Sequence, residues 1–293
     1  MSIIRVIPRL DIKGPNLVKG IRLEGLRVLG KPELFAKHYY ETGADELIYM
    51  DIVASLYGRN SLHEMISRTA REIFIPLTVG GGLRTIDDIR SVLRAGADKV
   101  ALNTAVIGRP EFIREAAQKF GSSTIVVSIE AKRFSDGRYE AYTDNGREST
   151  SVDAFEWAER AVALGAGELL VTSIDQEGTG GGFDLQLIKR IADAVNVPVI
   201  AGGGAGRPEH VGQVIEESGS SAVSIASMFH YGFVDYMRQH PGDYSGEGNT
   251  EFLTSGSSFS KVQPTSIPEL KTYLTKKKNC CRPFNRKSLR EVS

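Results

Sequence analysis

The sequence has little of several features that would place it in other classes of protein. It contains only two cysteines, Cys280 and Cys281, and because they are adjacent they suit neither a disulfide framework nor a metal site. No apolar run approaches the roughly 18 residues that a membrane span requires. The 36 basic residues equal the 36 acidic residues, so charge favours neither nucleic acid nor an anionic membrane as the main partner.

The first residues also lack a long apolar segment, so we expect no signal peptide and a cytoplasmic location. We expect no cofactor and no metal ion. The composition, 41% hydrophobic and 25% charged, is ordinary for a globular enzyme.

What the sequence does contain is a regular alternation of short β-rich and helical segments. Three strands are preceded by a similar phrase in which a helix ends at glycine: TGADELIYMD (42–51), RAGADKVALN (94–103) and ALGAGELLVTS (163–173). Helical patterns of ten to fifteen residues lie between the strands, which indicates βαβ units and a parallel sheet. Eight strands are expected, at 4–11, 46–52, 75–80, 98–103, 124–130, 167–173, 197–202 and 222–226. Eight such units in about 235 residues predict an α/β fold of the (β/α)8 TIM-barrel type.

The second half of this barrel repeats features of the first. PLTVGGG (76–82) returns 122 residues later as PVIAGGG (198–204), and VALNTAV (100–106) returns 123 residues later as VSIASMF (223–229). Asp51 returns as Asp175 after 124 residues. We therefore predict an internal half-barrel duplication.

The domain organisation follows from where this pattern stops. We expect the barrel to occupy residues 1–239 and a Gly/Ser-rich insertion to occupy 240–265. The periodic segment at 266–278 is predicted to be the closing helix of the barrel, and 279–293 a basic tail.

Two of the expected strands end on a carboxylate, Asp11 in IRVIPRLDIKG and Glu130 in TIVVSIEAKRF. The active site of a barrel of this kind lies at the carboxyl ends of its strands. Two carboxylates in different surroundings can divide general acid and general base work. We therefore predict that both are catalytic.

Two glycine runs, Gly80–Gly82 and Gly202–Gly204, follow matching strands of the two halves. Each run is accompanied by small polar residues after the next strand, Asn103-Thr104 in one half and Ala226-Ser227 in the other. Backbone N–H groups without obstructing side chains, near helix N-termini, bind phosphate oxygens. The two copies predict a bisphosphate substrate that spans the mouth.

A third group of charged residues is expected at the other end of the strands. Arg5, Lys99 and Glu168 share strand parity with inward-pointing residues near the mouth, so they should point into the barrel at its bottom, and Glu46 should join them. From the residues alone, a structural plug is the favoured reading of this ring, and a functional role remains the alternative.

Together these residues resemble the cyclase subunit of imidazole glycerol phosphate synthase, the HisF family, over about residues 1–235 and the closing helix. The resemblance implies that Asp11 is the general acid and Glu130 the general base, and that the ring of Arg5, Glu46, Lys99 and Glu168 is a gate for ammonia. It implies a glutaminase subunit as the partner at the N-terminal face of the barrel. The substrate-binding and phosphate-binding residues it implies are Lys19, Thr78, Gly81, Gly82, Asn103, Thr104, Thr172, Glu177, Gly178, Gly203, Gly204, Ala226 and Ser227.

The implied reaction joins ammonia to a ribulosyl aminoimidazole carboxamide bisphosphate, yielding imidazole glycerol phosphate and AICAR. This sequence departs from the family pattern at three positions: Glu130 and Glu177 stand where the family has Asp, and Arg9 where it usually has Cys. Arg9 has the parity of Asp11 and is expected to pair with Asp11 or Glu130.

These departures leave an alternative open, a HisF-like subunit that channels ammonia for amidation of a nucleotide sugar in surface polysaccharide synthesis. Another reading within the same fold is the related ProFAR isomerase. That enzyme uses no ammonia, so the charged ring and Lys19 speak against it. A non-catalytic ammonia conduit would not depend on Glu130, and a plain phosphate-binding module would not need the ring.

Overall fold

The computed structural model describes residues 3–21, 24–52, 60–239 and 261–282. Most of the predicted insertion (240–260) and most of the predicted tail (283–293) lie outside these residues. Among the described helices, none is both long enough and apolar enough to cross a membrane.

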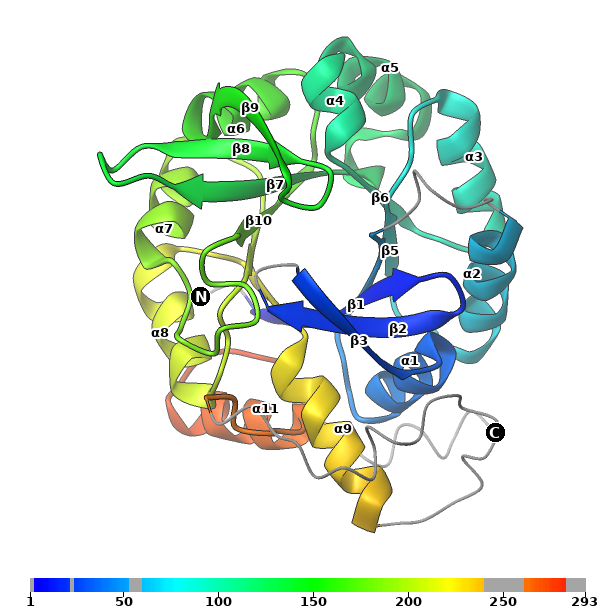
Figure 1. The fold of residues 1–293 in the computed structure, drawn as a ribbon, viewed down its shortest axis with the longest axis vertical. Coiled ribbons are helices and arrows are strands. Elements are labelled where there is room, and N and C mark those ends of the chain that lie inside the picture. The colour runs from blue at the N-terminus through cyan, green and yellow to red at the C-terminus, as the bar shows by residue number, and fades with distance from the viewer. Residues whose placement is uncertain (1–2, 22–23, 53–59, 240–260, 283–293) are drawn as a thin grey trace.

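Eight parallel strands form one closed ring (Figure 1). Its first strand pairs with its last, and the two halves also join through the parallel pair of β6 with β7. The strands of the ring are β1 (Arg5–Lys13), β4 (Leu47–Asp51), β5 (Leu77–Gly80), β6 (Lys99–Leu102), β7 (Ile125–Arg133), β10 (Glu168–Ser173), β11 (Val199–Gly202) and β12 (Ala222–Ile225). The predicted (β/α)8 barrel is confirmed, and every expected strand has a counterpart in the ring.

Helices surround the ring on the outside (Figure 1). They are α1 (Pro32–Glu41), α2 (Asn60–Glu72), α3 (Ile86–Ala95), α4 (Thr104–Gly108), α5 (Glu111–Phe120), α6 (Ala154–Ala163), α7 (Leu185–Ala194), α8 (Pro208–Ser218), α9 (Ser227–Gln239) and α11 (Ile267–Lys276), with a 3-10 turn, η1, at Ser122–Thr124. Helix α3 shows why they form where they do. Thr85 and Asp88 make a reciprocal capping box at its start, and Gly96 ends it with φ +119°.

Two antiparallel hairpins extend from the ring, and they were not expected from the sequence. The first consists of β2 (Asn16–Ile21) and β3 (Glu24–Gly30) after β1, and the second of β8 (Tyr139–Thr143) and β9 (Glu148–Asp153) after β7. Each hairpin follows the first strand of its half-barrel, which agrees with the predicted duplication. In Figure 1 the two hairpins lie on opposite sides of the ring.

The inside of the ring is filled in layers, because alternate residues of each strand point inward. The charged ring predicted from parity lies at the bottom. Above it is an apolar layer that includes Ile7, Ile48, Val126, Leu170 and Ile200. Arg9 and Thr172 follow, and Asp11 and Glu130 lie at the mouth. The barrel therefore has a closed apolar section between two charged ends.

The chain beyond residue 260 completes the outer wall. On α11, Lys271 Nζ donates to Asp45 Oδ1 at 2.9 Å, and the other oxygen of Asp45 accepts from the backbone N–H of Val6 at 2.8 Å. Further on, the carbonyl of Cys280 accepts from the N–H of Ile4 at 2.7 Å. These contacts fasten the segment after the helix to the bottom of β1.

Candidate active site

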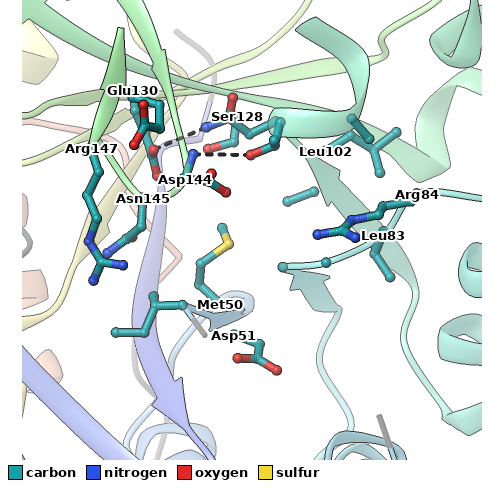
Figure 2. A pocket seen from close by; sticks show the side chains of 18 residues that line it. Met50, Asp51, Leu83, Arg84, Leu102, Ser128, Glu130, Asp144, Asn145 and Arg147 are labelled. Carbon is teal, nitrogen blue, oxygen red and sulfur yellow. Dashed lines mark hydrogen bonds between the residues drawn. The ribbon is translucent and has the colours of Figure 1, made fainter. Parts of the chain in front are cut away.

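A cavity of about 250 Å³ opens at the carboxyl ends of β4 to β7. It is lined by the ends of four strands and by the turn between β8 and β9 (Figure 2). Among the residues predicted from sequence, it brings together Gly81, Gly82, Asn103, Thr104 and Glu130. Residues from separate parts of the first half-barrel and the start of the second thus share one cavity.

Glu130 is one of four carboxyl groups that line this cavity, with Asp51, Asp144 and Glu148. Only 3% of its surface is exposed, and its Oε2 accepts from Asn103 Nδ2 at 3.1 Å. Burial raises the pKa of Glu130 to about 7, against the opposing effect of Arg9, because the charged form loses its hydration. A group with this pKa can both give and take a proton near neutral pH.

Asp11 has different surroundings. Its Oδ1 accepts from Arg9 Nε at 2.8 Å, and its Oδ2 lies 3.9 Å from Lys19 Nζ. Burial opposes its ionisation, but Arg9 and Lys19 together hold the pKa of Asp11 below its ordinary value. Of the two partners that parity allowed for Arg9, the structure selects Asp11 for the hydrogen bond.

Lys19 lies on β2 and pairs with Glu177, which follows β10. Both side chains are buried, so the pair joins the first hairpin to the second half-barrel across the mouth. Lys19 is held within the β2–β3 ladder, opposite Arg27 of β3.

The glycine runs have backbone conformations that other residues rarely adopt. Gly81 has φ +103°, and a Cβ there would lie 2.1 Å from the carbonyl oxygen of Asp51. Gly204 also has φ +103°, and its Cβ would lie 1.9 Å from the carbonyl oxygen of Gly182. Glycine is therefore required at both places, where the backbone itself faces the mouth.

The second glycine run lies beside the start of a long helix. Ser227 is the first residue of the 13-residue α9, and Ala226 precedes it directly. Gly203 and Gly178 have φ +86° and φ +71°. The free N–H groups of a helix N-terminus next to glycine backbone are suited to a phosphate.

Two of the three predicted threonines, Thr78 and Thr172, lie lower in the barrel than the cavity. Thr172 is fully buried, and its Oγ1 accepts from Arg9 Nη1 at 3.3 Å. Thr78 is buried on β5, two residues before the last residue of that strand, and does not line the cavity described above. Thr172 therefore acts on Arg9 rather than facing the cavity.

The four residues of the charged ring form a closed circuit at the bottom of the barrel. Arg5 contacts Glu46 at 2.7 Å and Glu168 at 2.6 Å. Lys99 contacts the other oxygens of the same two carboxylates, each at 3.0 Å. Each cation thus bridges both anions, and the ring is neutral as a whole.

Sequence reasoning missed several residues that line the cavity. Arg84 follows the first glycine run, and Arg147 follows a turn in which Asp144, Asn145 and Gly146 all have positive φ. In Figure 2 the two arginines lie on opposite sides of the cavity. The letters DNGR were a usable signal, since Asp-Asn-Gly favours such turns. Among the described residues, no cluster of three or more histidine, cysteine or carboxylate side chains is arranged to hold a metal ion.

The fold and the mouth define a class: a (β/α)8 barrel with an inward carboxylate on the first strand of each half and a glycine-lined loop in each half. Comparisons with known proteins agree. Residues 5–235 match the model of the histidine biosynthesis protein family. The chain is also 59% identical, over 209 residues, to imidazole glycerol phosphate synthase subunit HisF of Legionella pneumophila, a match that covers 71% of this chain and 99% of that protein.

The chain therefore belongs to the histidine biosynthesis protein family, within its HisF branch of cyclase subunits of imidazole glycerol phosphate synthase. The predicted family and the predicted enzyme class, a lyase or cyclase subunit, are confirmed. The alternative of an ammonia-channelling subunit for sugar amidation is not favoured by these matches.

Proposed function

We propose that the mouth of this barrel joins ammonia to a ribulosyl aminoimidazole carboxamide bisphosphate and releases AICAR and imidazole glycerol phosphate. The observation that carries the proposal is the pair of buried carboxyl groups, Asp11 and Glu130, on the first strands of the two half-barrels. Their surroundings separate their pKa values, so one group can carry a proton where the other is a carboxylate.

The two glycine-lined loops bind the two phosphates in this proposal. In the first half, Gly81, Gly82, Asn103 and Thr104 offer backbone and side-chain donors around the cavity. Arg84 and Arg147 add two positive charges at its rim, where they neutralise a phosphate. In the second half, Gly203, Gly204 and the start of α9 bind the other phosphate, so the reacting centre lies between the halves.

We further propose that a glutaminase subunit docks at the bottom of the barrel and supplies ammonia through the charged ring. Phe74 is 75% exposed and Ile3 is 63% exposed, and both precede strands of the ring, so they lie at this end. A hollow beside Phe74 is lined by Ile73, Pro76 and Asp98, among others. Exposed apolar side chains next to a hollow are typical of a protein interface.

The apolar layer above the ring suits the passage of a small neutral molecule. Ammonia that enters there is kept from bulk water until it reaches Arg9 and the mouth. The cytoplasmic location expected from the sequence is part of this proposal.

An ammonia-dependent assay tests the reaction without the partner. Purified chain, the bisphosphate and saturating ammonium salt at alkaline pH should release AICAR with a turnover on the order of one per second. No release, with the bisphosphate still bound in calorimetry, would refute the proposed reaction.

The docking face is tested separately by co-purification with the candidate glutaminase and by measuring glutamine hydrolysis. Phe74→Glu should weaken the complex at least tenfold, because it places a charge in an apolar contact. The control is Tyr236→Glu, which changes an exposed aromatic residue of α9 on the outer wall. Equal binding of both variants and the unchanged chain would contradict this face.

A further inference from the structure

Apart from His230, whose imidazole is neutral because burial lowers its pKa to about 3, five ionisable side chains lie together, buried, between the apolar layer of the barrel and the mouth. Two are cations, Arg9 and Lys19, and three are carboxyl groups, Asp11, Glu130 and Glu177. With all five ionised the cluster carries one excess negative charge away from water. Since burial of an uncompensated charge is costly, a neutral cluster requires one carboxyl group to hold a proton.

The contacts show which carboxyl group this is. Asp11 accepts from the Arg9 guanidinium and lies near the Lys19 ammonium, and Glu177 pairs directly with Lys19. Glu130 instead accepts from neutral donors, the side-chain amide of Asn103 and the backbone N–H of Gly146. Each cation thus contacts one of the other two carboxylates directly. Because Glu130 has no such cation contact, the extra proton is on Glu130.

We propose that Glu130 is protonated in the resting protein and performs both proton donation and proton removal, while Asp11 is a permanent carboxylate held in place by Arg9. This inference rests on the proposed function and changes the assignment of roles that the family resemblance implied. In it, Arg9 is a positioning residue. It acts on the reaction through Asp11 and through the charge of the cluster.

The position of the two groups relative to the cavity supports the same assignment. Glu130 lines the cavity at the mouth, whereas Asp11 is not among its lining residues. The groups that face Glu130 are Arg9 and Asp11 from β1 and Glu177 from the loop after β10. Burial raises the pKa of Glu130 to about 7 in spite of Arg9, while Arg9 and Lys19 overcome burial and lower the pKa of Asp11.

One carboxyl group is enough for the addition of ammonia to a carbonyl carbon of the substrate. As the nitrogen lone pair forms the C–N bond, the π electrons of the carbonyl move to its oxygen, which takes the proton of Glu130. The attached nitrogen is then cationic and loses a proton to the Glu130 carboxylate. Glu130 ends the step protonated, as it began, and no other reactant is needed.

Infrared difference spectroscopy of the whole chain reads the resting protonation state directly. At neutral pH, the spectrum should contain a buried carboxylic-acid C=O band that disappears in Glu130→Gln. The band should shift in frequency in Asn103→Ala, which removes a donor to Glu130 and leaves the charge of the cluster unchanged. A band that persists in Glu130→Gln or keeps its frequency in Asn103→Ala, or the absence of any such band, would overturn the proposal. This readout does not depend on turnover, so it distinguishes a failure of this inference from a failure of the proposed reaction.

The pH dependence of ammonia-driven turnover, normalised to unprotonated ammonia, is the second measurement. The rate should fall as pH rises through about 7, as Glu130 loses its proton. Arg9→Gln removes a cation that favours ionised Glu130, so this fall should move to higher pH by on the order of one unit. Arg9→Lys should keep the position of the fall closer to that of the unchanged chain, since the charge is retained.

The matched control is Arg68→Gln, which removes an arginine from the exposed face of α2. It should leave the profile where it is. A shift of the same size in Arg9→Gln and Arg68→Gln, or a fall that does not move in Arg9→Gln, would contradict the role of Arg9. If Arg9→Gln does not fold, Arg9→Lys and the infrared spectra still decide the question.

Discussion

Lys99 Nζ lies 3.0 Å from a carboxylate oxygen of Glu168, and the residues that hold these two side chains are 69 positions apart in the chain. Both begin strands of the ring and point inward at the same height, so closure of the ring brings them together. Arg5 and Glu46 close the circuit, and two cations with two anions offset part of the cost of removing four charges from water.

Removal of one member of this ring should destabilise the barrel. Lys99→Met leaves Glu46 and Glu168 with Arg5 as their one ring cation, and we expect a loss of about 1–3 kcal/mol in the free energy of unfolding, measured by urea denaturation. The loss is below the range for fully buried pairs because Lys99 retains some exposure. Lys37→Met breaks an exposed pair with Glu72 and should cost less than about 0.5 kcal/mol. Equal losses in the two variants would show that the ring adds nothing beyond a surface ion pair.

The backbone at the second glycine run should not tolerate a side chain. Gly204→Ala adds a methyl group in the position of the Gly182 carbonyl and also strains a positive φ. We expect a loss of more than about 2 kcal/mol in stability and a marked rise in KM for the bisphosphate. Gly137→Ala carries a similar strain, at φ +85°, but its Cβ would meet nothing within 4 Å. Gly137→Ala should lower the free energy of unfolding by about 1 kcal/mol and leave KM unchanged. If Gly204→Ala had the same small effect, the argument from close backbone approach would be refuted.

The two arginines at the rim of the cavity should contribute to substrate binding. Arg147→Gln or Arg84→Gln should raise KM for the bisphosphate about tenfold with a smaller effect on kcat, because each loses a charge-assisted contact with a phosphate. Steady-state kinetics with saturating ammonia measure both constants. Arg114→Gln on α5 is the control, since Arg114 pairs with Glu111 on the outer wall. A fall in kcat without a change in KM would place the arginines in the chemical step instead.

The raised pKa of Glu130 should make stability depend on pH. Between about pH 4.5 and pH 7 the folded protein retains a proton on this group that the unfolded chain releases, so folding stability should decline as pH rises through this range. Glu130→Gln removes the effect. Relative to the unchanged chain, it should gain on the order of 3 kcal/mol between pH 4.5 and pH 8, followed by chemical denaturation.

Ser128→Ala is the control for this measurement, because Ser128 lines the same cavity but does not titrate in this range. The difference between Ser128→Ala and the unchanged chain should be constant over the pH range. A constant difference for Glu130→Gln as well would mean that Glu130 titrates normally in the folded protein.

The fold was largely readable from the sequence. Every strand of the ring could be located from three local and regular features. These are helix stop signals at glycine, strands of similar length, and two glycine runs at matching positions of the two halves. The hairpins after β1 and β7 were missed for a physical reason. Strand β9 (Glu148–Asp153) is polar and partly exposed, so it shows no core-facing alternation, and within the described sheet it pairs with β8 only.

Among the site residues, the sequence placed Asp11 and Glu130 at strand ends and predicted the four members of the charged ring. It did not settle the partner of Arg9, because parity puts that side chain within reach of both carboxylates. It also gave no reason to join Arg147 to Gly81, since the turn that holds Arg147 reaches this cavity only through the second hairpin.

Strand positions, glycine positions and parity are consequences of chain geometry over a few residues, and the sequence by itself determined them, although β1 and β7 continue past the predicted ends to Lys13 and Arg133. The tertiary structure decided which charges are neighbours, because closure of the ring sets the distances between side chains from different strands. That closure brings Lys19 to Glu177 and leaves Glu130 among neutral donors, while Arg9 bonds to Asp11 of its own strand. The same two carboxylates that the sequence presents as equivalent therefore differ in charge state, since the electrostatic free energy of a buried group depends on its neighbours in space.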